Sequence, residues 1–110
     1  MLILVADDEQ ILRDIIKKNC IRQGHQVILA KNGEEALHLL QKNNFDMLIT
    51  DNDMPKLKGL ELIKIVQPQL LKLKIILISG NHVDKIPPGV IFLSKPDFIK
   101  ELDKILKEAQ

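Results

Sequence analysis

The sequence predicts an α/β fold in which a doubly wound parallel sheet carries helices on both faces. Five short runs rich in Val, Ile and Leu recur along the 110 residues, and segments with helical spacing separate most of them. Runs that are apolar throughout are typical of strands buried on both faces, as strands are in parallel sheets. Alternating strands and helices imply right-handed crossovers, which cover both sides of the sheet. At this length we expect one domain, residues 1–110.

The five predicted strands are the apolar runs at Leu2–Ala6, Gln26–Ala30, Met47–Thr50, Lys74–Ser79 and Val90–Ser94. The second run has more polar flanks than the others, which is typical of a strand at the edge of a sheet.

Four segments have apolar residues at helical spacing and are predicted helices. They are about Glu9 to Gln23, Asn32 (as cap) to about Lys42, roughly Leu60 to Val66, and Phe98 to Ala109. Gly24 ends the first helix. Asn32 is a predicted N-cap, with Glu35 three residues later in the style of a capping box. Cys20 falls on the apolar side of the first helix, so we expect a buried structural thiol.

The segment between the fourth and fifth strands departs from this pattern. Asn81–Ile86 offers only Val83 and Ile86 as apolar residues before Pro87-Pro88-Gly89 stops any helix. At most one or two helical turns fit here.

Composition excludes several classes of function. A formal net charge of +1 argues against nucleic-acid binding through bulk charge. No apolar run is long enough to span a membrane, and a single cysteine suits a reducing compartment, so we expect a cytoplasmic protein. The three histidines, His25, His38 and His82, lack metal-ligand spacing and are interpreted as surface residues.

Four polar residues mark the ends of predicted strands: Asp7, Asp51, Ser79 and Lys95. Ligands bind beyond the carboxyl ends of parallel strands, so these side chains are expected to converge. Two acids, a hydroxyl and an ammonium form a set suited to Mg²⁺ and phosphate.

Each of these residues has a simpler interpretation when taken alone. Asp7 and Asp8 could cap a helix and complement its dipole, Ser79 could be an ordinary small residue, and Lys95 before Pro96 could be a surface lysine. Capping does not account for Asp51, because no helix starts there. Crowded carboxylates repel one another unless a cation neutralises them, so the conjunction favours a Mg²⁺ site.

With these motifs in place, the chain resembles the receiver domain of two-component response regulators over essentially its whole length. The matching residues are Asp7-Asp8, Asp51 in LITDNDMP, Gly59 in KGLEL, Ser79 in LISG, Phe92 and Lys95-Pro96. The resemblance implies the flavodoxin-like receiver fold with strand order 2-1-3-4-5, here with a shortened helix 4. It also implies a cis peptide bond between Lys95 and Pro96.

The resemblance further implies a phosphorylation-dependent signalling switch rather than a conventional enzyme. Asp51 is the phosphoacceptor, and Mg²⁺ is held by Asp7 or Asp8, by Asp51 and by the backbone carbonyl of Asp53. Ser79 and Lys95 hold phosphoryl oxygens. Movement of Ser79 makes room for Phe92 to swing inward. A Phe within VIFL is more often an ordinary core residue than a switch. Because Phe lacks the hydroxyl of tyrosine, any switching here would rest on packing alone.

The implied partners are a sensor histidine kinase or phosphotransfer protein and an output partner of unknown identity. No direct contact with nucleic acid or membrane is expected, and the chain is expected to be a monomer or a weak phosphorylation-linked dimer. In many relatives, output is carried by the face formed by the fourth helix (here Asn81–Ile86), the fifth strand (Val90–Ser94) and the last helix (Phe98 to Ala109). The shortened fourth helix therefore predicts a remodelled output face.

Two other classes of function remain open on the sequence. One is a degenerate receiver that acts only as an interaction module, against which the full set of site residues argues. The other is a Mg²⁺-dependent phosphatase of the haloacid-dehalogenase type, prompted by Asp51-Asn52-Asp53, although such enzymes carry this motif on their first strand. A flavodoxin-like FMN binder is disfavoured because no Ser/Thr/Gly-rich loop follows the first strand.

Overall fold

The computed structural model describes residues 1–109, which form five strands and four helices. The strands are β1 (Leu2–Ala6), β2 (Gln26–Ala30), β3 (Met47–Asp51), β4 (Lys74–Ser79) and β5 (Val90–Ser94). All pairings are parallel and the spatial order is β2-β1-β3-β4-β5. The predicted fold class and strand order are therefore confirmed, with β2 at an edge as expected.

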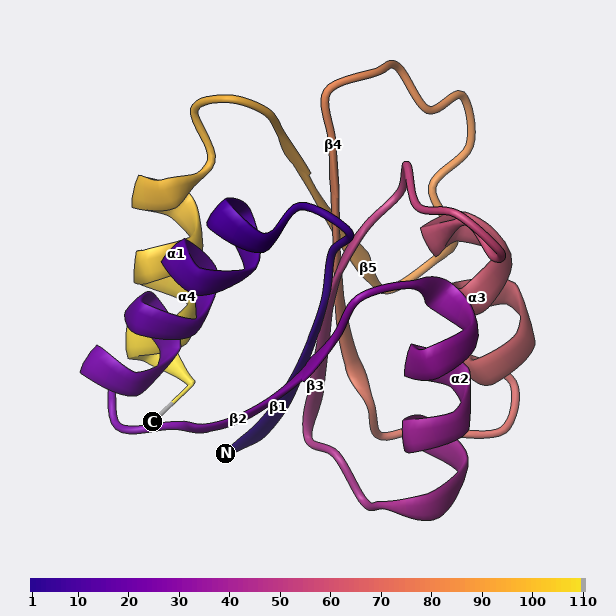
Figure 1. Cartoon of the computed structure of the whole chain (residues 1–110), viewed down its shortest axis with the longest axis horizontal. Coiled ribbons are helices and arrows are strands. Elements are labelled where there is room, and N and C mark those ends of the chain that lie inside the picture. The colour runs from indigo at the N-terminus through magenta and orange to yellow at the C-terminus, as the bar shows by residue number, and fades with distance from the viewer. Residues whose placement is uncertain (110) are drawn as a thin grey trace.

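The helices lie in two layers on either side of this sheet (Figure 1). They are α1 (Gln10–Arg22), α2 (Gly33–Lys42), α3 (Gly59–Val66) and α4 (Ile99–Glu108). Helices α1 and α4 cover one face, and α2 and α3 cover the other (Figure 1). Each begins and ends within a residue or two of its predicted position.

Alternation of side chains along each strand divides the core into two halves. In β1, Ile3 and Val5 face the α1 and α4 layer, whereas Leu4 faces the α2 and α3 layer. The same division runs through β3 and β4, whose apolar side chains are buried on both faces. Burial at about 25 cal/mol per Å² of apolar surface holds the three central strands in place. The strand ends that carry the polar residues are thus rigidly supported.

The predicted cap of α2 is present. Asn32 Oδ1 accepts a hydrogen bond of 2.8 Å from the backbone N–H of Glu35. Oε1 of Glu35 accepts from the N–H of Lys31, one residue before the cap, at 3.2 Å. This is a shifted form of the predicted capping box.

The chain between β4 and β5 contains no helix within the described residues. Figure 1 shows it as a loop that rises above β4 and returns past α3. The sequence predicted a shortened helix of at most one or two turns here, and that helix is absent: the segment has only two apolar residues to bury before Pro87-Pro88-Gly89. We refer to residues 80–89 below as the β4–β5 loop.

The interpretation of His25 as a surface residue was wrong. Its side chain is buried, Nε2 lies 2.8 Å from the carbonyl oxygen of Leu106, and Nδ1 lies 3.0 Å from the amino group of Met1. Since a carbonyl only accepts, Nε2 carries the hydrogen and Nδ1 accepts. His38 and His82 are exposed as predicted. Cys20 is buried as predicted, and burial raises the pKa of its thiol to about 12.

Among residues 1–109, no helix combines the length and the apolar character that crossing a membrane requires.

Candidate functional site

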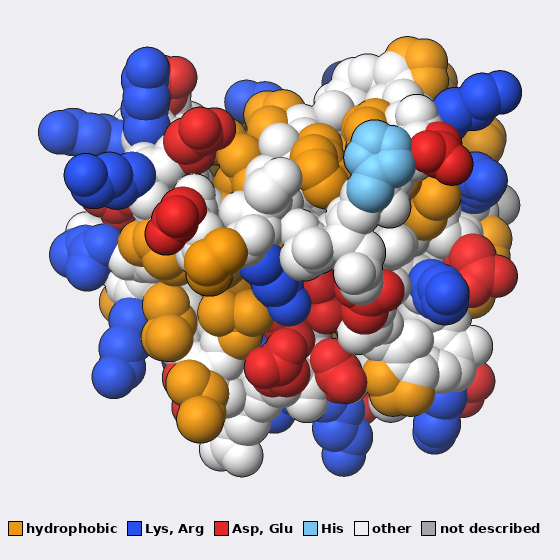
Figure 2. All heavy atoms as spheres, turned by 90° about the horizontal axis from the view of Figure 1, so that it is seen from above, with side chains coloured by type: hydrophobic (Ala, Val, Ile, Leu, Met, Phe, Trp, Pro, Cys, Tyr) orange, Lys and Arg blue, Asp and Glu red, His pale blue; other side chains and the backbone are white. Residues whose placement is uncertain are grey.

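The polar residues at the strand ends lie on one edge of the sheet. Asp7 follows β1, Asp51 ends β3, Ser79 ends β4 and Lys95 follows β5. The space-filling view of this edge shows acidic side chains gathered near its centre with a basic side chain beside them (Figure 2). The predicted convergence of these four residues is present.

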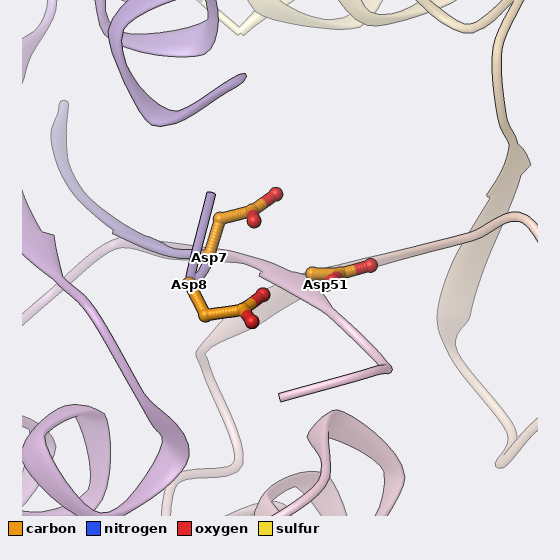
Figure 3. Close-up of side chains that lie close together, drawn as sticks. All are labelled: Asp7, Asp8 and Asp51. Carbon is orange, nitrogen blue, oxygen red and sulfur yellow. The ribbon is translucent and has the colours of Figure 1, made fainter. Parts of the chain in front are cut away.

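Asp7, Asp8 and Asp51 form an acidic cluster at the centre of this edge. Each offers a carboxylate oxygen, and the three oxygens lie within 4.8 Å of one another. Figure 3 shows the side chains of Asp7, Asp8 and Asp51 close together, with their carboxylates extending to the same side. Asp7 and Asp51 are buried, whereas Asp8 is exposed. Carboxylates this close repel one another in the absence of a cation.

Burial and charge repulsion raise the pKa values of Asp7 and Asp51. Burial is the main cause that raises the pKa of Asp7 to about 6, and the nearby charge of Asp51 adds to the rise. The hydrogen bond that Oδ1 of Asp7 accepts from the N–H of Glu9, at 2.9 Å, lowers this pKa in part. Burial likewise raises the pKa of Asp51, although the ammonium of Lys95 counteracts the rise. Carboxyl groups whose pKa values are perturbed by burial and by a specific charged neighbour are typical of functional sites.

Lys95 supplies the positive charge of the site. Its Nζ lies 3.1 Å from Oδ1 of Asp51 and 3.6 Å from Oε1 of Glu9. Burial lowers the pKa of Lys95, but Asp51, Asp7 and Glu9 outweigh that effect, and the net shift is upward. The ammonium is therefore charged at neutral pH. The peptide bond between Lys95 and Pro96 is cis, as the resemblance implied.

Ser79 is held by the start of the β4–β5 loop. The side chain is buried, and its Oγ accepts a hydrogen bond of 3.0 Å from the backbone N–H of Asn81. The side-chain amide of Asn81 donates to Oδ2 of Asp53 at 3.0 Å. The loop after β3 and the loop after β4 are thus joined across the site.

A close backbone contact fixes the loop behind Asp51. A Cβ atom on Gly59 would overlap the carbonyl oxygen of Asp51, so only glycine fits there without movement. The N–H of Gly59 donates to the carbonyl of Asn52 at 3.0 Å, and Oδ1 of Asn52 accepts from the N–H of Leu60 at 2.9 Å. These contacts join the start of α3 to the end of β3 and so fix the backbone at Asp51.

Phe92 lies in β5 opposite Leu77 of β4. It is half-buried and packs with the apolar residues of the α2 and α3 layer, in a group that includes Ile86 and Val90. The structure therefore places it beside the β4–β5 loop, and its role as a switch stays a prediction.

Two contacts of the site were not predicted from the sequence. Glu9 contacts Lys95, and the guanidinium of Arg13 donates to the backbone carbonyl of Asp7 at 2.7 Å. Glu9 and Arg13 are four residues apart at the start of α1, on one side of the helix. The sequence shows this spacing, but it does not show the partners of these two residues, which lie at the ends of other elements.

The residues present fit a divalent cation. Three carboxylates provide the hard oxygen ligands that Mg²⁺ prefers. Oδ1 of Asp51 is buried and, among the described residues, receives no hydrogen bond of good geometry; its nearest charged contact is Lys95. One ammonium offsets only part of the charge of three crowded carboxylates, so a divalent cation would stabilise the cluster.

A family model of the response regulator receiver domain matches residues 3–107. The chain belongs to this family. Receiver domains are signalling switches, which agrees with the expectation that the chain is not a conventional enzyme.

Several curated relatives support the assignment. A chemotaxis protein CheY homolog from Campylobacter jejuni is 46% identical over 71 residues, which cover 63% of this chain and 55% of that protein. The response regulator receiver protein CpdR from Brucella abortus is 32% identical over 114 aligned residues, covering 94% of this chain and 95% of that protein. The alkaline phosphatase synthesis regulator PhoP from Bacillus subtilis is 36% identical over 79 residues, 72% of this chain. The alignments span about half of the Campylobacter protein and a third of PhoP.

Solved receiver structures share the fold. The response regulator TrrA from Thermotoga maritima, in complex with Mg²⁺ and BeF, superimposes with a TM-score of 0.86 at 29% identity. That match covers 99% of this chain and 98% of TrrA. The receiver domain of the hybrid histidine kinase CckA is 34% identical with a TM-score of 0.84, covering 98% of this chain and 97% of that one.

Proposed function

We propose that this receiver domain is switched by transfer of a phosphoryl group to Asp51. The observation that carries the proposal is a buried carboxylate between an acidic pair and a lysine, at the end of a central strand. A carboxylate oxygen of Asp51 attacks phosphorus, the bond from phosphorus to the donor breaks, and an acyl phosphate forms. The donor is the phosphohistidine of a partner kinase or phosphotransfer protein, or a small acyl phosphate.

The neighbouring side chains fit the charge that develops in this transfer. The ammonium of Lys95 already contacts Asp51, so it is in position to bind an oxygen of a phosphoryl group attached there. Ser79 offers a hydroxyl at the end of the next strand. Asp7, Asp8 and Asp51, with the backbone carbonyl of Asp53, would hold Mg²⁺. When bound, the ion neutralises the charge on the transferring group and on the carboxylates.

The switch starts from Ser79 in this proposal. Its Oγ accepts from the N–H of Asn81, so its own hydroxyl hydrogen remains available to a phosphoryl oxygen. Movement of Ser79 toward the phosphate would weaken its contact with Asn81 and leave space that Phe92 could fill. Phosphorylation would therefore bias the position of the β4–β5 loop.

The wider setting of the chain is part of the proposal. A cytoplasmic location and a histidine kinase or phosphotransfer partner suit a receiver domain. The output partner is unidentified, and several relatives are longer than the region they share with this chain.

Intact-mass measurement after incubation with Mg²⁺ and a small acyl phosphate tests the proposal. We expect one added phosphoryl group, which is absent from Asp51→Asn and retained by Asp84→Asn, a control at an exposed acid of the loop. The Asp51→Asn variant removes the nucleophile while keeping the size of the side chain. An added group that persists in Asp51→Asn, or none with any donor, would overturn the proposal.

The same preparation separates the rival functions. Continuous hydrolysis of an added phosphate ester would support a phosphatase. Failure of the domain to bind Mg²⁺ would support a phosphorylation-independent interaction module.

A further inference from the structure

A groove lies between α3 and the β4–β5 loop, beside the acidic cluster. It encloses about 1090 Å³, and residues of α3 and of the loop between positions 82 and 88 form its walls. Asn52, next to the phosphoacceptor, lines the groove as well. Because the loop forms no helix, this space is open along the side of α3.

The lining of the groove includes an apolar strip. Leu60 from α3 and Val83 and Ile86 from the loop line it, and all three side chains are half-buried. Leu60 and Ile86 pack against the core beneath them, so the strip is held in place rather than free in solvent. A strip of this kind in a groove suits the apolar side chains of a peptide segment.

The charged residues of the groove leave an excess of positive charge. Lys58, Lys64 and Lys85 line it, are exposed, and form no ion pair within residues 1–109. The two acidic residues that line it already have partners. Oε1 of Glu61 accepts from the N–H of Lys58 at 3.2 Å, and Oδ1 of Asp84 lies 3.0 Å from Nε2 of His82.

We propose that this groove binds an acidic amphipathic segment of a partner protein. The apolar residues of that segment would contact Leu60, Val83 and Ile86, and its acidic residues would pair with the three lysines. Charge complementarity selects an acidic segment over a basic one and speeds association. The partner would bind on the side of the domain where the loop replaces a helix.

Binding at the groove would also respond to the phosphoacceptor. The loop is tied to the site through the bonds of Asn81 to Ser79 and to Asp53. Movement of Ser79 would release one of these ties and shift the wall that carries Val83 and Ile86. This coupling rests on the proposed phosphorylation of Asp51, whereas binding to the groove does not.

Selection from a display library of random peptides, panned against the full chain, tests the binding. We expect enriched peptides to combine spaced apolar residues with acidic ones. Their affinity should fall at least about tenfold in the double variant Lys64→Glu/Lys85→Glu. The matched control Lys18→Glu/Lys42→Glu reverses two exposed lysines outside the groove and should bind as the natural chain does.

Three outcomes would overturn the binding proposal: no enriched peptide, enriched peptides without acidic residues, or binding that both double variants weaken equally. Self-association of the chain that Lys64→Glu/Lys85→Glu abolishes would also overturn it, in favour of a second copy as occupant.

The coupling is tested with one enriched peptide and the phosphorylated chain, whose state is checked by intact mass. We expect at least about a threefold change in affinity relative to the unphosphorylated chain, and none in Asp51→Asn treated in the same way. Equal affinity of the two verified states would overturn the coupling. A chain that binds the peptide but gains no phosphoryl group would contradict the proposed function and leave the groove proposal standing.

Discussion

The carboxyl ends of β1, β3 and β4 and the β4–β5 loop differ in how firmly the chain holds them. At the strand ends, Asp7, Asp51 and Ser79 are all buried, and each is attached to a strand with neighbours on both sides. In the loop, most side chains are exposed and the longest apolar ones are half-buried. The two regions meet at Asn81, which contacts both Ser79 and Asp53.

In the proposed function, this difference separates the site of phosphorylation from the surface that would bind a partner. Reactive groups need fixed positions, and buried strands supply them. A surface that must change on signalling is drawn from the less stable part of a fold. The strand ends carry the polar residues that the sequence placed there, whereas the loop is where this chain departs from the predicted helix.

The first prediction adds one methyl group at the contact between the end of β3 and the start of α3. Gly59→Ala places a Cβ atom against the carbonyl oxygen of Asp51, and the end of β3 or the start of α3 must move. We expect a loss of about 3 kcal/mol in the free energy of unfolding, measured by urea denaturation.

Gly80→Ala is the matched control in the loop. Its Cβ would lie 3.7 Å from Cβ of Lys95, an ordinary contact, so we expect a change of less than about 1 kcal/mol. Equal losses in the two variants would show that the β3–α3 contact is no tighter than the loop.

The second prediction tests the positive charge that lies beside the buried strand ends. Lys95→Ala removes the ammonium that lies 3.1 Å from Asp51, and we expect the rate of phosphorylation by a small acyl phosphate to fall about 10²-fold. Lys100→Ala, at an exposed position of α4, should keep the natural rate. A Lys95→Ala rate within about twofold of the natural one would remove Lys95 from the proposed mechanism.

The sequence also predicted the buried strands and their ends better than it predicted the β4–β5 loop. The strands were readable because apolar runs such as Leu2–Ala6 have no alternative to burial on both faces. Their carboxyl ends share one edge, so the convergence of Asp7, Asp51 and Ser79 followed from topology. The cap at Asn32 was readable because its partner, Glu35, is local.

Contacts between elements far apart in the chain could not be predicted from local sequence. His25 was assigned to the surface because nothing in its local sequence shows that Leu106 and Met1 lie against it. Lys95 was expected near Asp51, but its contact with Glu9 depends on where α1 begins. In the β4–β5 loop, local signals showed that a long helix could not form, and they left open how the chain runs past α3.

The third prediction concerns how the stability of the domain depends on pH through Asp7. Burial raises the pKa of Asp7 to about 6 in the folded domain without metal, above its value of 3.8 in the unfolded chain. The folded state therefore binds the proton more tightly, so the metal-free domain gains stability as pH falls from 7 toward 5. With allowance for solvent screening, we expect about 1 to 2 kcal/mol from urea denaturation with a chelator present.

Mg²⁺ should reverse this trend. The ion needs the deprotonated carboxylates, so its stabilising effect should be present at pH 7.5 and should diminish as pH falls through about 6. Asp7→Asn removes the titrating group and should flatten the pH dependence of the metal-free domain. A metal-free domain that loses stability between pH 7 and 5 would show that other groups dominate.

The last prediction concerns the loop and has the smallest expected effect. Ile86 is half-buried at the groove, whereas Leu62 of α3 is fully buried in the adjoining core. We expect Ile86→Ala to cost less than about 1.5 kcal/mol of unfolding free energy, against about 2 to 5 kcal/mol for Leu62→Ala. Backbone amides of the loop should also exchange with solvent faster than those of α3. If Ile86→Ala cost as much as Leu62→Ala, the loop would be packed as firmly as the core. It could not then yield to a bound segment or to movement of Ser79, because both require a wall that costs little to shift.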